Sequence, residues 1–297
     1  MYREVATAAV AAVAAYLTYQ ILPSHYLKHQ FLLALAYIPA VVGVVQLLKM
    51  GLVNFGYAMY YMAGAYAAAL VYKHWGVKEI SILLPISLAG GLLLAILTAP
   101  AARTRGIFYA LLNLAFSMIP YGLILKLYHI TGGSDGITII GLTLFGSRIS
   151  LDTLALFLAV VTFVVLLWNF IYVNSSYEYV SWGIRDNEIR MSALGVNVEK
   201  FIFIVTLYSA VLAALSGVLV AVITWHVTPE YGHWAKSGLF VLSGVAGLFI
   251  SRKYGFVLGP VLIVVATTLG TRLGYDIVLG LGFLALYIAS YLRYVKS

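Results

Sequence analysis

Phe201–Trp225 reads FIFIVTLYSAVLAALSGVLVAVITW, a stretch of 25 residues without a charged side chain. A helix of about 20 apolar residues is long enough to cross the hydrocarbon layer of a membrane. Within the stretch, Ser209, Ala213, Ser216 and Gly217 form a row of small residues, which is typical of a face on which membrane helices pack closely. The stretch therefore predicts a membrane-spanning helix that packs against neighbouring helices.

The rest of the chain has a similar composition. Of its 297 residues, 63% are hydrophobic and 9% are charged, whereas a soluble domain carries about 25% charged residues. The 18 Lys and Arg residues lie scattered between apolar runs, so the net charge of +8 indicates basic anchors at membrane faces rather than a nucleic-acid surface. We therefore expect a single transmembrane domain over residues 1–297, in contact with the lipid bilayer of the cell (plasma or inner) membrane and with no nucleic-acid partner.

Ten apolar runs are candidate membrane helices, which predicts an all-α polytopic membrane protein. The first run, Val5–Leu22, is longer than the apolar part of a signal peptide and lacks a small-x-small cleavage site, so we predict a span. Ser237–Ile250 has only about 14 residues and is either a short tilted span or a re-entrant hairpin, which gives ten spans or nine. The other runs are Phe31–Leu48, Gly51–Tyr72, Ile80–Thr98, Gly106–Leu127, Asp152–Val173, Phe201–Trp225, Phe256–Thr271 and Ile277–Tyr291.

The basic residues predict an orientation for these spans. Placing the polar segment Asn174–Lys200 in the cytoplasm puts 11 of the 18 Lys and Arg residues on the cytoplasmic side and 7 outside. Both termini are then cytoplasmic. The glycine-rich loop Thr131–Ile137 is then extracytoplasmic.

The motifs of several protein classes are absent from the sequence. It contains no P-loop, no HExxH zinc motif, no paired carboxylates and no cysteine. We therefore expect that the chain is not an enzyme and holds no metal or cofactor. All ten acidic residues fall in loops or at span ends, whereas ion-coupled transporters usually keep an ionisable residue deep in the membrane. If the protein moves a solute uphill, we expect the energy to come from a partner.

Asn174–Lys200 is the longest polar interruption in the chain, and we expect it to lie in water or against a water-soluble partner. Within it, Arg185–Leu194 predicts a short helix, with Asp186 and Arg190 spaced i,i+4 and Gly195 placed to end it. An isolated helix of this length is marginal in water. Its apolar side chains therefore leave two interpretations, which are docking on a partner and a connecting helix that lies on the membrane surface.

Five stretches together resemble one family. GIRDNEIRMSALGVNVEKF, Gly183–Phe201, resembles the cytoplasmic coupling loop of the branched-chain amino acid ABC permeases of the LivM type. The other four resemble further elements of that family and are RGIFYALLNLAF at Arg105–Phe116, TGGSDGI at Thr131–Ile137, TPEYGHW from Thr228 and GPVL from Gly259. Gly51–Tyr66 departs from the LivM pattern and is closer to the sister permease LivH.

The resemblance implies an ABC importer permease fold and an ATP-driven import of branched-chain or related amino acids. It implies a second homologous permease subunit, two ATPase subunits that bind ATP and Mg²⁺, and an extracytoplasmic substrate-binding protein as partners. The helix that couples this chain to the ATPases would comprise Arg185, Asp186, Asn187, Glu188, Ile189, Ala193, Leu194 and Gly195. A urea or short-amide importer of the same superfamily is an alternative substrate class. An ion-driven secondary transporter and a non-transporting scaffold are alternative functions.

Three uncharged polar residues within the spans, Asn54, Asn113 and Ser117, are able to line a path for a zwitterion. The alternative is that they form hydrogen bonds that hold the helices together. Three glycines would let a helix break or pack closely, namely Gly51, Gly56 and Gly64.

The loop TGGSDGI has the composition of a tight turn. Its glycines would allow the turn, and its two polar residues would be exposed on the outer side, where Asp135 could also meet the binding protein. These residues are Gly132, Gly133, Ser134, Asp135 and Gly136.

Overall fold

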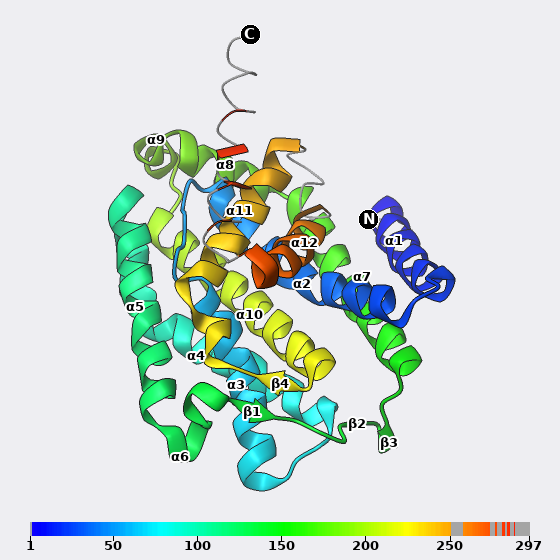
Figure 1. Cartoon of the computed structure of the whole chain (residues 1–297). Coiled ribbons are helices and arrows are strands. Elements are labelled where there is room, and N and C mark those ends of the chain that lie inside the picture. Colours follow the sequence, from blue (N-terminus) through cyan, green and yellow to red (C-terminus); the bar gives the residue numbers. More distant parts are fainter. Residues whose placement is uncertain are drawn as a thin grey trace.

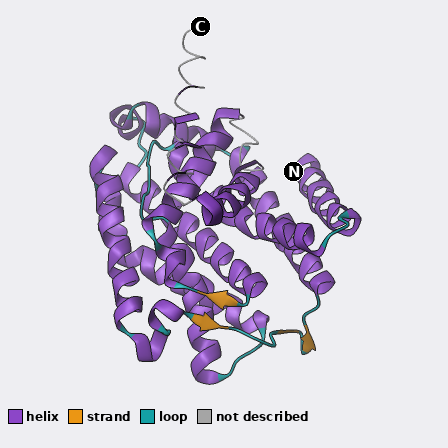
Figure 2. Ribbon diagram, in the orientation of Figure 1, coloured by secondary structure: helices purple, strands orange, loops and turns teal. Residues whose placement is uncertain are grey.

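The computed structural model describes residues 2–250 and 258–273, together with residues 277, 281, 282, 284, 285 and 288. In this part of the chain, long helices form a bundle, and short strands and loops join them at one end (Figures 1 and 2). The predicted span Ile277–Tyr291 lies largely outside the described residues.

Nine long helices make up most of the described chain. They are α1 (Tyr2–Ile21), α2 (His25–Lys49), α3 (Ala58–Trp75), α4 (Ile80–Leu97), α5 (Gly106–Lys126), α7 (Leu151–Val173), α10 (Val198–Thr224), α11 (Trp234–Ile250) and α12 (Leu258–Leu273). The shorter helices are η1 (Ala99–Arg103), α6 (Tyr128–Thr131), η2 (Gly133–Asp135), α8 (Ser176–Asp186), α9 (Glu188–Ala193) and η3 (Pro229–Gly232). The strands are β1 (Ile137–Thr138), β2 (Thr143–Leu144), β3 (Ser147–Arg148) and β4 (His226–Val227).

The membrane character predicted from composition is confirmed. Among the described residues, 5 helices are long and apolar enough to cross a membrane, namely α2, α4, α5, α7 and α10. Val5–Ile21 and Trp234–Phe249 are shorter apolar helices. The number of spans and the side on which the termini lie remain predictions.

The third predicted span begins later than the sequence indicated. Gly51, with a φ of +76°, ends the turn after α2, and the side-chain oxygen of Asn54 accepts a hydrogen bond from the Gly56 amide at 2.9 Å. The chain therefore becomes helical only at Ala58, whose amide donates to the Ser237 hydroxyl at 2.9 Å. Because this cap comes from α11, local sequence could not reveal it.

The short apolar run Ser237–Ile250 forms a single helix and not a re-entrant hairpin. It belongs to α11, which begins three residues earlier, at Trp234, and continues without a break to Ile250. The residues before it, Pro229–Gly232, form the 3₁₀ turn η3.

Helix α10 lies at the centre of the bundle and packs against α2, α3 and α4 (Figure 1). Its small-residue face allows close approach to α3, because a Cβ added to Gly64 would overlap the backbone of Ala214, and a Cβ added to Gly217 would overlap the carbonyl oxygen of Tyr61. The predicted packing face on Phe201–Trp225 is thus confirmed.

Two hydrogen bonds from neighbouring segments reach α2 near Pro39, which lies inside this helix. The Ser216 hydroxyl donates to the carbonyl oxygen of Ala36 at 2.6 Å, and the Tyr57 hydroxyl donates to that of Ala40 at 2.9 Å. A proline within a membrane helix is tolerated where neighbours bind the backbone groups around it.

Short strands at the end of the bundle away from α8 and α9 add to the all-helical fold that we expected. Strand β1 pairs with β4, and β2 pairs with β3 (Figure 1). The β2–β3 hairpin is held by Glu79, whose carboxylate accepts hydrogen bonds from the Thr143 hydroxyl at 2.7 Å and the Phe145 amide at 2.6 Å. These bonds, first that from Thr143, lower the pKa of Glu79.

We predict that Gly64→Ala destabilises the protein, because the new methyl group would push α3 away from α10. Overpacking of this kind typically costs about 1–3 kcal/mol. The thermal unfolding midpoint of the purified protein measures the effect. Gly122→Ala in α5 is the matched control, since a Cβ there meets nothing within 4 Å. Equal midpoints for the two variants would contradict close packing at Gly64.

Candidate functional site

Three side-chain caps in the polar segment mark the starts of the short helices α8 and α9 and of the long helix α10. The Ser175 hydroxyl accepts a hydrogen bond from the Tyr177 amide at the start of α8. The Asn187 side chain does the same for the Arg190 amide at the start of α9, at 2.9 Å, and Asn197 caps α10. Such caps satisfy amide groups that have no partner within the helix. The segment thus passes from α7 through α8 and α9 directly into α10.

The prediction of one helix over Arg185–Leu194 was wrong. Helix α8 ends at Asp186, and α9 covers only Glu188–Ala193. The break lies at Asn187, which is extended, with φ −163° and ψ 102°. An N-cap residue takes a non-helical conformation so that its side chain can reach the next turn. Gly195, beyond the end of α9, has a φ of +89°.

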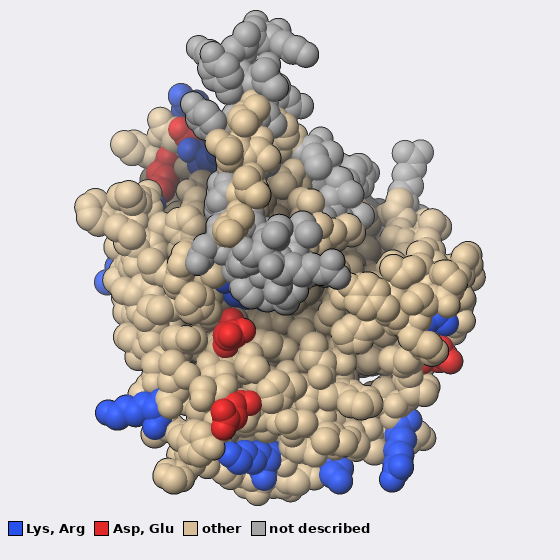
Figure 3. All heavy atoms as spheres, viewed as in Figure 1, with Lys and Arg blue, Asp and Glu red and all other residues tan. Residues whose placement is uncertain are grey.

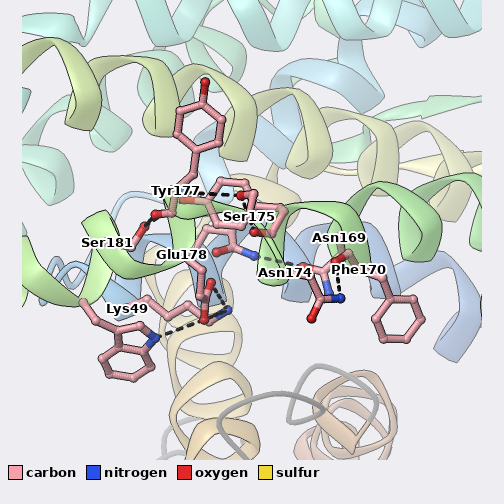
Figure 4. Close-up of polar contacts among 11 residues, drawn as sticks. Lys49, Asn169, Phe170, Asn174, Ser175, Tyr177, Glu178 and Ser181 are labelled. Atoms are coloured by element: carbon pink, nitrogen blue, oxygen red, sulfur yellow. Dashed lines mark hydrogen bonds and ion pairs between the residues drawn. The ribbon is translucent and has the colours of Figure 1, made fainter. Parts of the chain in front are cut away.

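A buried ion pair fixes α8 to the end of α2. The Lys49 ammonium lies 2.9 Å from both carboxylate oxygens of Glu178, and the two residues are 1% and 9% exposed (Figure 4). The Trp182 indole N–H also donates to Glu178, at 3.0 Å. The sequence-based expectation that Glu178 lies in water or against a partner was therefore wrong, because its carboxylate is paired inside the chain.

A second ion pair joins α9 to the start of α5. The Arg105 Nε donates to the Glu188 carboxylate at 2.6 Å, and both side chains are partly exposed. One terminal nitrogen of Arg105 also donates to the carbonyl oxygens of Ala102 and Thr104, at 2.6 and 2.9 Å. These bonds to backbone carbonyls fix the orientation of the guanidinium independently of its bond to Glu188. Charge-assisted hydrogen bonds of this type are among the stronger ones.

Two large apolar side chains, one in α9 and one directly after it, are uncovered. Ile189 is 83% exposed and Leu194 is 73% exposed, and Arg185, Asp186 and Ala193 beside them are exposed as well. On the other side of α9, Met191 packs against Gly183 of α8. The two helices therefore form one unit that is attached to α2, α5 and α10 and presents large apolar side chains to the surroundings.

The three polar residues predicted to line a path are buried at one end of α3 and along α5. Asn54 and Ser117 are 0% exposed and Asn113 is 1% exposed. The Asn113 amide donates to the Tyr109 carbonyl and the Ser117 hydroxyl to the Leu114 carbonyl, both on their own helix. Asn113 also lies against Gly56, where a Cβ would overlap its carbonyl oxygen. The described structure thus places Asn113 against Gly56, whose amide Asn54 binds, and the role of these residues in transport remains a prediction.

The glycine-rich loop lies at the opposite end of the bundle from α9. Gly132, Gly133 and Gly136 have φ angles of +80°, +54° and +73°, in the left-handed region that glycine adopts at little cost. Ser134 and Asp135 are exposed, as predicted for the tip of a turn, and the Tyr128 hydroxyl donates to Asp135 at 3.1 Å. The loop then enters β1, which pairs with β4.

The anchoring residues Lys49 and Arg105 were not among the predicted site residues. Lys49 is a single basic residue at the end of an apolar run, and Arg105 forms a basic pair with Arg103 between two runs. Both patterns are typical of membrane-face anchors. Their partners, Glu178 and Glu188, lie more than 80 residues away along the chain. The only sequence signal for the two ion pairs was that the polar segment contains acidic residues.

Comparisons with known proteins agree with this architecture. A family described as "Branched-chain amino acid transport system / permease component" matches residues 26–289. The chain is 29% identical over 248 residues to the high-affinity branched-chain amino acid transport system permease protein LivM of Salmonella typhimurium, and 28% identical over 248 residues to that of Escherichia coli. The alignments cover 74% of this chain and 57% of each relative, so the chain spans little more than half the length of the curated relatives it matches. No solved structure matches the chain significantly.

We predict that Glu178→Gln lowers the free energy of unfolding by about 3–5 kcal/mol, since it leaves the Lys49 ammonium buried without a counter-charge. Replacing both partners, by Lys49→Met with Glu178→Leu, removes the charges together and is expected to cost much less. Thermal unfolding of the purified variants measures both effects.

The exposed pair of Arg103 and Glu199, 3.9 Å apart, provides the control. Glu199→Gln should change the stability by no more than about 1 kcal/mol. If the double variant Lys49→Met with Glu178→Leu were as unstable as Glu178→Gln, the unpaired buried ammonium would not be the cause of the destabilisation.

Proposed function

The chain belongs to the branched-chain amino acid transport permease family, and on that premise we propose that it is the transmembrane subunit of an ATP-driven importer. Its solute is a branched-chain or related amino acid. The chain itself performs no hydrolysis, since ATP and Mg²⁺ bind to two partner ATPase subunits. A second homologous permease completes the membrane part, and an extracytoplasmic binding protein delivers the solute on the side of the TGGSDGI loop.

The observation that carries this proposal is the pair of uncovered apolar side chains, Ile189 of α9 and Leu194 directly after it. A largely exposed isoleucine on a short helix and a leucine at its end favour a covering partner, which is either another protein or the membrane surface. Ile189 and Leu194 are 83% and 73% exposed in the chain alone. We assign these side chains, with Arg185 and Asp186 beside them, as the surface that docks on an ATPase subunit. The alternative of a helix that rests on the membrane surface is an outcome of the test below.

The two ion pairs supply a mechanical connection from that surface to the membrane helices. A displacement of α9 is passed to α5 through the Glu188–Arg105 pair. It is passed to α2 through α8 and the buried Glu178–Lys49 pair (Figure 4), and to α10 through the short connection that Asn197 caps. Closure of the ATPase dimer on ATP would therefore move three long helices together and switch access to the solute between the two sides of the membrane.

We predict that Ile189→Ser with Leu194→Ser abolishes co-purification of the ATPase subunits, because it removes most of the apolar surface of α9. Both side chains are largely exposed, so the fold should be unaffected. The measurement is the ratio of ATPase subunit to permease after affinity purification from membranes.

The matched control is Phe145→Ser at the other end of the molecule, where the side chain is 84% exposed. The ATPase ratio of this variant should equal that of the unmodified chain. If the α9 variant retained its ATPase subunits in full, α9 would be a connecting helix on the membrane surface and the proposed docking would be wrong.

A further inference from the structure

A cavity of about 350 Å³ lies between α5, η3 and the first turns of α11, remote from the α8–α9 unit. Its walls include Tyr121 from α5, Glu230 and His233 from η3 and its flank, and Lys236 and Leu239 from α11. The volume is at the lower end of the range of about 300–1,000 Å³ typical of small-molecule sites. The cavity thus has the size for a small solute and contains one acidic and one basic side chain.

One side of the cavity packs on α3, and Glu230 in its wall is exposed. The Tyr231 ring of η3 is 5.2 Å from the Tyr61 ring of α3, and Gly232 packs against Met62. Helix α3 continues for 13 residues beyond Met62, to Trp75, which at 1.5 Å per residue is about 20 Å. Non-helical backbone at membrane depth occurs only where it is buried in protein or lines a water-filled cavity. The turn η3 meets that condition by lining this cavity.

Lys236 lies in the wall of the cavity, and its ammonium group does not use all of its hydrogen-bond donors. Its ammonium donates to the Tyr37 hydroxyl at 2.9 Å and lies over the Tyr37 and Tyr61 rings, 4.9 and 6.0 Å from their centroids. An ammonium has three donors, so two are left for a ligand. Among the described residues, no carboxylate forms an ion pair with it.

Glu230 is the complementary group. In the part of the chain that the structure describes, its carboxylate has neither an ion pair nor a side-chain hydrogen bond. Figure 3 shows that charged side chains are sparse on this side of the molecule between its two ends. A cation and an anion that share a small cavity without pairing with each other match a ligand that carries both charges.

We propose that this cavity binds the α-amino acid group of the transported solute. Lys236 takes the carboxylate, Glu230 takes the ammonium group, and Tyr121 and Leu239 contact the aliphatic side chain. The inference rests on the proposed importer function and narrows its substrate class. Urea and short amides carry no charge and would form no ion pair with Lys236 or Glu230, so the cavity favours amino acids over them.

Binding to the full-length chain in lipid nanodiscs tests this assignment without the ATPases. The probes are L-leucine, 4-methylpentanoate, which lacks the amine, and 3-methylbutylamine, which lacks the carboxylate. We expect the unmodified chain to bind leucine at least about tenfold more tightly than either analogue, because each loses a charge-assisted contact. Saturation-transfer NMR titrations give the three affinities.

The variants should change selectivity and not only affinity. Glu230→Gln should bind leucine and 4-methylpentanoate about equally, and Lys236→Gln should lose its preference for leucine over the amine. Lys236→Arg should restore part of that preference, and Lys126→Gln, outside the cavity, should behave like the unmodified chain. Unfolding midpoints establish that each variant is folded.

The inference is overturned if the unmodified chain does not prefer leucine, or if folded Glu230→Gln and Lys236→Gln variants keep its preferences. Failure of the importer function is a separate result, in which the complex with its ATPases shows no ATP-dependent uptake of leucine although the selectivity pattern in nanodiscs is as expected.

Discussion

The buried ion pair between Lys49 and Glu178 is the constraint on which the arrangement of the polar segment depends. An ammonium ion that is 1% exposed at the end of an apolar helix requires a counter-charge, and Glu178 is the residue that supplies it. Because Glu178 lies in the first turn of α8, pairing fixes that helix against α2. The position of α8 then fixes α9 through the single extended residue Asn187.

Close helix packing transmits this constraint through the bundle. Helix α10, which follows α9 directly, approaches α3 through Gly217 and Gly64 with no space for another carbon atom. Helix α5, which Arg105 connects to α9, contacts η3 and the cavity with Lys236 and Glu230. Helix α5 therefore reaches the proposed docking unit at one end and the proposed solute site farther along. A coupled importer requires such a connection between its energy input and its solute.

Sequence reasoning identified the features that depend on local composition. Apolar runs located the long helices, the small residues of Phe201–Trp225 indicated a packing face, and the motifs indicated the family that the comparisons then supported. It failed where a distant residue decides the local structure. Ala58 begins α3 because Ser237 caps it, and Glu178 is buried because Lys49 lies across from it. Neither pairing has a signature in a single sequence, since each joins segments more than 100 residues apart.

We propose that α9 transfers motion to the membrane helices through the Glu188–Arg105 pair. The most direct measurement is the number of leucine molecules imported per ATP hydrolysed in proteoliposomes that contain the complete complex with Glu188→Gln. We expect that the ATPases remain bound and hydrolyse ATP while this ratio falls severalfold, and that Glu199→Gln, in an exposed pair, leaves it unchanged. A ratio for Glu188→Gln equal to that of the unmodified complex would contradict a transfer of motion through this pair.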